Sequence, residues 1–250
     1  MICSTKLPLK VGLFCLFWLI GFNNYASFLD EQLKYSRVKK AYQQKEPLIR
    51  QNLTDMDLKT SNFELYVRAF KSEQTVRIYV KKTDQNVWKE YKSIRFNCTS
   101  GELGPKRMEG DYQIPEGFYH FNHFNPYSSF VLSLGVSYPN KADRIKSQFD
   151  RLGGNIYMHG GCATIGCIPI EDEPIKELYI LGVLAKNNGQ SKIPIHIFPF
   201  EYSDDNFKKA VMKYPEHKKF WQNVFEVDEH FRSSRELKAV KIDPNGDYRV

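Results

Sequence analysis

The sequence predicts an α+β fold, with a mainly antiparallel β core and helices on its periphery. Residues 63–69 and 76–80 alternate strictly between apolar and polar side chains, which is typical of half-buried antiparallel strands. Over 220–231 the apolar residues instead recur every three to four positions, as in an amphipathic helix. A chain of 250 residues that is 42% hydrophobic and 26% charged can form one well-buried domain with additional elements.

Residues 1–27 are predicted to be a signal peptide or an N-terminal anchor. Lys6 and Lys10 precede an apolar run over 11–22, which has about the length of a signal h-region and is short for a membrane span. We therefore expect an exported protein of the periplasm or cell envelope, which would contact a membrane only through an uncleaved N-terminal segment. Removing this segment lowers the formal charge from +7 to +5, because it contains two lysines and no acidic residue. No Lys/Arg stripe interleaved with aromatic residues is present, so nucleic acid is not expected as a partner.

Three of the five cysteines follow residue 27, namely Cys98, Cys162 and Cys167. An odd number outside the cytoplasm leaves at least one free thiol, which suits a cysteine nucleophile better than a pure disulfide scaffold. Cys98 shares strand parity with Ile94, so a buried, unreactive core thiol is expected there.

The N-terminal half is predicted to contain helices followed by strands. Residues 28–61 form a helical segment that Pro47 divides into two pieces. The two alternating strands are joined by a turn at 71–74, and a third strand is expected over 91–98. Glycine and proline interrupt residues 100–125 every few positions, which indicates loops and turns leading into a strand.

Further strands and helices are predicted downstream. Acidic residues and a proline at 172–174 open a helix that Asn187-Asn188-Gly189 closes. The remaining expected elements are a strand over 193–198, a helix over 204–214 before the helix over 220–231, and a terminal hairpin within 239–250.

The residues that can carry chemistry concentrate in 159–167, which reads His-Gly-Gly-Cys-Ala-Thr-Ile-Gly-Cys. Residues 155–159 alternate as a short strand that would direct His159 towards an opening. The glycines of this stretch allow positive φ and can bare backbone N–H groups, which a developing oxyanion needs. A thiol beside an imidazole suits nucleophilic catalysis, in which the imidazole takes the proton and the thiolate attacks a carbonyl. Spacing alone also allows structural cysteines beside a hydrogen-bonded histidine.

This stretch resembles the signature of the L,D-transpeptidase catalytic (YkuD-like) family of murein enzymes, in which a His-Gly precedes a Ser-x-Gly-Cys-type turn that bears the nucleophile. Residues 164–167 match that turn, whereas Pro169 stands where the family commonly has an arginine. The motifs at 104–106, 110–111 and 115–119 resemble the YafK-type branch, some members of which cut murein links rather than form them.

The resemblance implies a role for each candidate residue. Cys167 would be the nucleophile and His159 its base. Gly166, Thr164 and Gly160 would supply oxyanion or substrate contacts, and Lys106 would bind a substrate acid.

The resemblance also implies the substrate and the domain organisation. The catalytic domain, an L,D-transpeptidase-like sandwich or barrel, would span residues 62–200, with helices and a hairpin from 201–250 packed on the same domain. The partner would be a peptidoglycan stem peptide, held as an acyl-enzyme and passed to an amine or to water. A murein-linked lipoprotein is a further candidate partner, and neither a cofactor nor a metal is expected.

Two alternatives remain open. A zinc-dependent murein peptidase could use a set of nitrogen and sulfur ligands, but positions three apart on a strand point to opposite faces, which disfavours His120 and His123 as a pair. A non-catalytic wall-binding module could instead join Cys162 and Cys167 in a disulfide on the glycine-rich loop.

Overall fold

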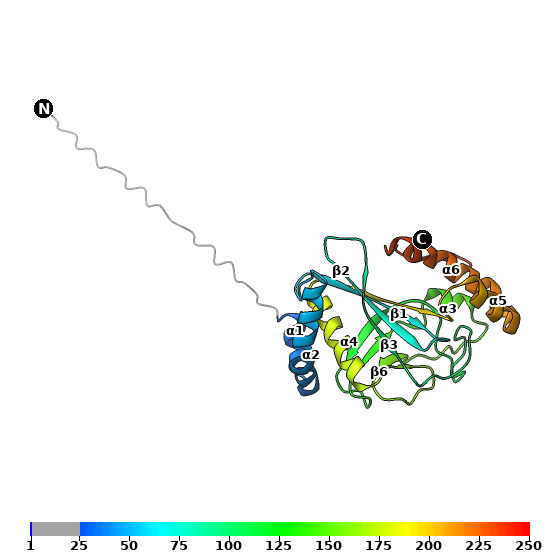
Figure 1. The fold of residues 1–250 in the computed structure, drawn as a ribbon, viewed down its shortest axis with the longest axis horizontal. Coiled ribbons are helices and arrows are strands. Elements are labelled where there is room, and N and C mark those ends of the chain that lie inside the picture. Colours follow the sequence, from blue (N-terminus) through cyan, green and yellow to red (C-terminus); the bar gives the residue numbers. More distant parts are fainter. Residues whose placement is uncertain (2–25) are drawn as a thin grey trace.

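The computed structural model describes Met1 and residues 26–250, and its centre is one curled eight-stranded sheet with helices around it (Figure 1). The strand order is β3-β2-β1-β8-β4-β5-β6-β7. Most neighbouring strands are antiparallel, as predicted, but β1 runs parallel to β8 and β6 runs parallel to β7. The strands are β1 (Phe63–Phe70), β2 (Thr75–Lys82), β3 (Lys89–Arg95), β4 (Gly117–Asn125), β5 (Ser133–Val136), β6 (Tyr157–His159), β7 (Ile168–Pro169) and β8 (Ile193–Phe198).

The first hairpin forms where the alternating pattern predicts it. β1 and β2 pair over their full lengths, from Phe63 opposite Lys82 to Phe70 opposite Thr75. The third strand is shorter than predicted, because β3 ends at Arg95. Cys98 therefore lies beyond the end of the sheet and not among the core side chains of a strand.

Two helices, α1 (Phe28–Leu33) and α2 (Ser36–Asp55), form the N-terminal segment. The predicted division of the helical segment at Pro47 is wrong. The two helices are separated at residues 34–35, and Pro47 lies inside α2. A proline in a helix interior costs about 3 kcal/mol. Burial of one apolar face of α2 offsets this cost; its side chains in the main core are Val38, Ala41, Ile49 and Leu53.

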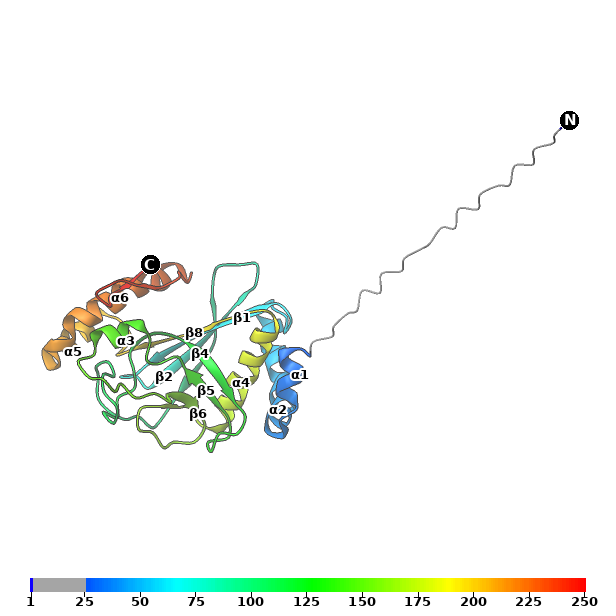
Figure 2. The same ribbon diagram turned by 180° about the vertical axis from the view of Figure 1, so that it is seen from behind.

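Helices lie at both ends of the molecule, with the sheet between them (Figures 1 and 2). α1 and α2 pack beside α4 (Asp172–Asn187) at one end. α5 (Asp204–Lys213) and α6 (Lys218–Ser234) lie at the other end, and both are helices that the periodicity predicts. α3 (Lys141–Lys146) is a short helix before β6.

The C-terminal elements bury a second apolar cluster, in which Trp221 and Phe225 of α6 join Phe198 and Phe200. The predicted terminal hairpin is present as β9 (Lys241–Ile242) and β10 (Tyr248–Arg249). α6 holds it, because the Asn223 amide donates a hydrogen bond to the Tyr248 carbonyl at 2.9 Å.

The predicted signal peptide or anchor lies almost wholly outside the described residues. Within residues 26–250, no helix combines the length and the apolar character needed to cross a membrane.

Candidate active site

His159 and Cys167 stand on two adjacent parallel strands. His159 ends β6, and Cys167 immediately precedes β7. Met158 lies opposite Ile168, so Cys167 is level with Tyr157 and shares a sheet face with His159. Both side chains line one cavity of about 230 Å³, whose other lining residues are Asn125, Tyr127, Ser128, Ser129, Phe130, Ser133 and Tyr157. The structure therefore brings together the two residues predicted to carry the chemistry.

The imidazole of His159 is held by one hydrogen bond and one aromatic contact. Its Nδ1 lies 2.6 Å from the carbonyl oxygen of Gly160, which can only accept, so Nδ1 carries the proton and Nε2 has the free lone pair. The Phe130 ring stacks on it with centroids 4.5 Å apart and an interplanar angle of 25°. Burial lowers the pKa of His159 below its ordinary value. A neutral imidazole with Nε2 unprotonated can act as a general base.

Cys167 is a free thiol, half-buried at the cavity wall. Burial raises the pKa of Cys167, although an N–H bond from Tyr157 to Sγ, at 3.4 Å, acts in the opposite direction. The S–H group donates to the Asn155 carbonyl at 3.6 Å. The resting group is thus a thiol, and it needs a base to become a nucleophile.

Thr164 and Gly166 shape the turn that presents the thiol. The Thr164 hydroxyl donates to the Cys167 carbonyl at 2.7 Å and accepts the Gly166 N–H at 3.2 Å. Gly166 has φ +127°, and a Cβ there would meet the Gln113 carbonyl oxygen at 3.0 Å. Thr164 therefore braces the turn that carries Cys167, and the Gly166 N–H predicted for an oxyanion is already bound to the Thr164 hydroxyl.

Gly160 is fixed from two sides. Its N–H donates to the Phe130 carbonyl at 3.1 Å, and a Cβ would come within 2.7 Å of both that oxygen and the Asp172 carboxylate. The next N–H, of Gly161, donates to Asp172 at 2.8 Å. The glycines after His159 thus permit close packing, and their amide groups are engaged in the protein itself.

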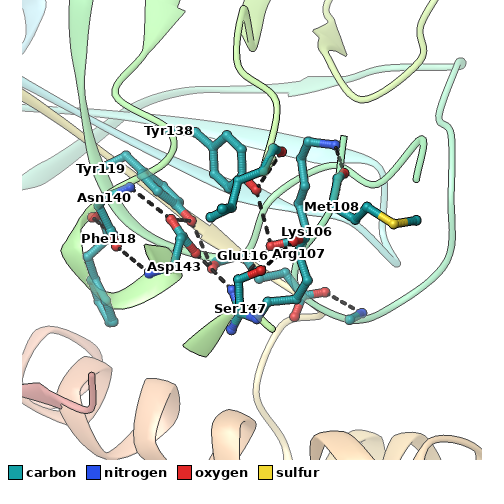
Figure 3. A network of polar contacts seen from close by, with 12 residues as sticks. Lys106, Arg107, Met108, Glu116, Phe118, Tyr119, Tyr138, Asn140, Asp143 and Ser147 are labelled. Carbon is teal, nitrogen blue, oxygen red and sulfur yellow. Dashed lines mark hydrogen bonds and ion pairs between the residues drawn. The ribbon is translucent and has the colours of Figure 1, made fainter. Parts of the chain in front are cut away.

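Lys106 does not line the cavity of Cys167. It belongs to a network of polar contacts that also contains Arg107 (Figure 3). The Lys106 ammonium is buried; it forms an ion pair with Asp111 at 2.5 Å and donates to the Met108 carbonyl. Arg107 pairs with Asp143 at 2.9 Å. The structure therefore gives Lys106 a structural partner and does not bring it to the cavity of Cys167.

Two cysteine assignments made from the sequence are wrong. Cys98 is not an isolated core thiol, because it forms a disulfide with Cys162, and the alternative Cys162–Cys167 pair does not form. The cause is that the chain after β3 passes beside the turn that follows β6, bringing Cys98 and Cys162 to a Cα separation of 5.4 Å. This pairing leaves Cys167 free, as an odd cysteine count requires. Among the described residues, no group of three or more His, Cys, Asp or Glu side chains could hold a metal ion.

Sequence reasoning missed the loop that forms one wall of the cavity. Val131 takes φ +68°, which a strand does not allow, so β5 begins only at Ser133. Phe130 is thereby turned onto His159. The only sequence signal for this loop was Asn125-Pro126, which indicates a turn but not its target.

The chain is similar to known proteins. Residues 65–185 match the family model of the YkuD L,D-transpeptidase catalytic domain. The chain is 29% identical to the Escherichia coli K12 protein named "Putative L,D-transpeptidase YafK" over 244 residues, which cover 96% of this chain and 90% of that protein.

Solved structures with some likeness come from two other organisms. Pgp2 of Campylobacter jejuni, described as a helical cell shape determining protein, aligns with TM-score 0.43 and 16% identity over 83% of this chain and 82% of that one. The chain spans 62% of a single-residue variant of that protein. Bd1075 of Bdellovibrio bacteriovorus aligns with TM-score 0.40 and 19% identity, over 68% of this chain and 57% of that one.

Proposed function

We propose that this protein is an exported cell-wall enzyme that uses Cys167 to form an acyl-enzyme with a murein stem peptide. The observation that carries the proposal is the shared cavity of His159 and Cys167, with Nδ1 of the imidazole held by a carbonyl and Nε2 left free. The family match and the YafK relative support the same class of chemistry.

In this proposal, Nε2 of His159 takes the thiol proton as Sγ of Cys167 attacks the carbonyl on the L-centre of a diamino acid in the stem peptide. The tetrahedral oxyanion is stabilised by backbone donors, and the Cys167 N–H is our candidate because the Gly166 N–H is bound to Thr164. The protonated His159 then gives its proton to the leaving amine. The shortened stem is then held as a thioester on Cys167, and the downstream group is released as a free amine.

The acyl group next passes to an amine, which makes a new link, or to water, which cuts one. Both outcomes use the same thioester. Pro169 is buried at the position where the family commonly has an arginine, and the motifs that resemble the YafK-type branch imply a kinship with enzymes that cut murein links; we therefore propose that hydrolysis is permitted. A murein-linked lipoprotein is a candidate substrate or acceptor in either direction.

The test is mass spectrometry of the muropeptides released after purified murein is incubated with the protein or with its Cys167→Ala variant. We expect shortened stems, new cross-links or both with the native protein, and an unchanged murein with the variant. Equal unfolding midpoints of the two proteins would show that the substitution spares the fold. Unchanged murein with the native protein, or products that persist in the variant, would refute the proposal.

A further inference from the structure

One wall of the active-site cavity is braced from outside the matched catalytic domain. α1 and α2 precede residue 65, where the family match begins. Nη1 of Arg37, near the start of α2, donates to the Ser128 carbonyl at 2.7 Å. The Tyr35 ring, just before α2, packs edge-on against Tyr127 with centroids 5.3 Å apart. Ser128 and Tyr127 both line the cavity of Cys167, so these contacts reach its wall.

The braced loop continues directly to the imidazole. The Ser128 hydroxyl accepts the Phe130 N–H at 3.1 Å, and the Phe130 ring covers one face of His159. The Phe130 carbonyl also accepts the Gly160 N–H. The loop 125–131 is therefore fixed by α2 at one side and fixes the base at the other.

The brace itself has a firm attachment. Gln32 of α1 accepts a hydrogen bond from the buried Tyr179 hydroxyl of α4 at 2.6 Å. Lys45 of α2 pairs with Glu173 at the start of α4 at 2.6 Å, and Val38 of α2 is fully buried. Because α1 and α2 are held on α4, they cannot easily follow a movement of the loop.

We propose that Arg37 and Tyr35 are positioning residues of the active site, which hold loop 125–131 so that Phe130 covers His159 and Tyr127 presents a fixed aromatic wall to the substrate. Tyr127 is 76% exposed, so its ring is available to a bound peptide. The role in substrate binding rests on the proposed function, whereas the effect on His159 and Cys167 does not.

The variant that tests the brace is Arg37→Ala, with Arg37→Lys as the conservative rescue. Lys40→Ala is the matched control, since Lys40 is an exposed cation of the same helix. In the full-length protein we expect Arg37→Ala to raise the pKa of His159 towards its ordinary value, measured by nuclear magnetic resonance of the labelled ring, because the ring gains water. In the same Arg37→Ala variant, iodoacetamide should alkylate Cys167 about threefold to tenfold faster. The rate is followed by mass spectrometry of the proteolytic peptide that contains Cys167.

With a muropeptide substrate, Arg37→Ala should raise KM by a similar factor and change kcat less, because a mobile wall weakens binding. Arg37→Lys should recover part of each effect, and Lys40→Ala should behave as the native protein. If the His159 titration and the Cys167 alkylation rate are unchanged in a Tyr35→Ala/Arg37→Ala double variant, the brace is refuted. If both change while the native protein leaves murein intact, the brace stands and the proposed function fails.

Discussion

His159 and Cys167 face one cavity as two neutral groups. Burial disfavours the charged form of each, which lowers the pKa of the imidazole and raises the pKa of the thiol. A preformed thiolate–imidazolium pair would require the opposite shifts. For the proposed function we therefore favour general-base activation of the thiol, with Nε2 of His159 accepting the proton during attack.

This account predicts the pH profile of kcat/KM. Activity should rise as pH increases through the pKa of His159, which burial lowers below its ordinary value, because only the neutral imidazole is a base. A His159→Gln variant should lose activity near neutrality and regain part of it only at alkaline pH, because burial raises the pKa of the Cys167 thiol. A native profile with an alkaline limb, where an imidazolium loses its proton, would instead indicate an ion pair and contradict this account.

Gly166 provides a second prediction for a single residue. In Gly166→Ala, φ near +127° and contact with the Gln113 carbonyl should together lower the free energy of unfolding by about 1–3 kcal/mol and displace Cys167. Gly189→Ala is the control, because Gly189 also has positive φ (+94°) but open space around it. Urea unfolding measures the loss of stability, and the rate of muropeptide processing measures the effect of displacing Cys167. A variant that is no less active than the control would show that the turn is not needed in this form.

Two connections join elements that are distant in the sequence. The Cys98–Cys162 disulfide ties the chain beyond β3 to the turn that follows β6. A buried ion pair between Arg68 of β1 and Asp228 of α6, at 2.6 Å, joins the sheet to the C-terminal helix. Neither link could be read from the sequence, because each joins residues whose proximity depends on the completed sheet.

Removing the disulfide should destabilise the protein. A Cys98→Ser/Cys162→Ser variant is expected to lose about 2–4 kcal/mol of unfolding free energy, because a closed loop of 64 residues no longer restricts the unfolded chain. Reductant should lower the unfolding midpoint of the native protein towards that of the variant and leave the variant unchanged. A native protein that is insensitive to reductant would contradict this role.

Breaking the Arg68–Asp228 pair should cost more than breaking a surface pair. Asp228→Ala leaves a buried guanidinium without its partner and should cost about 3–5 kcal/mol in urea unfolding. Arg68→Met/Asp228→Leu should cost less, because both charges are removed. Arg77→Ala, which breaks a more exposed pair with Glu201, is the control and should cost at most about 1 kcal/mol. Equal losses in the single and double variants would show that packing, not charge, is responsible.

Across the whole molecule, the sequence predicts local secondary structure better than it predicts contacts between segments that are far apart in the chain. The β1–β2 hairpin, α5, α6 and the terminal hairpin follow from periodicity and turn residues alone. Pro47 was misleading because apolar burial of α2 outweighs a local helix breaker. The parallel β1/β8 and β6/β7 pairs depend on chain crossings that periodicity does not encode.

The same division applies to the candidate site. The motif at 159–167 was enough to select His159 and Cys167 as a pair, and the structure places them on one cavity. The motif did not predict that Phe130 stacks on His159 or that Arg37 contacts the cavity wall, because these residues lie in distant segments that have no motif of their own. Composition also misplaced Lys106, whose buried ammonium pairs with Asp111 in a turn that composition describes only as a loop.

The measurement that tests the central claim most directly is the intact mass of the protein after rapid mixing with a purified tetrapeptide muropeptide and acid quenching. We expect a transient species heavier by the acyl fragment, located on the Cys167 peptide, absent in Cys167→Ala and slow to form in His159→Gln. Product formation by the native protein with no adduct on Cys167 at any time, or an adduct on another residue, would contradict the account.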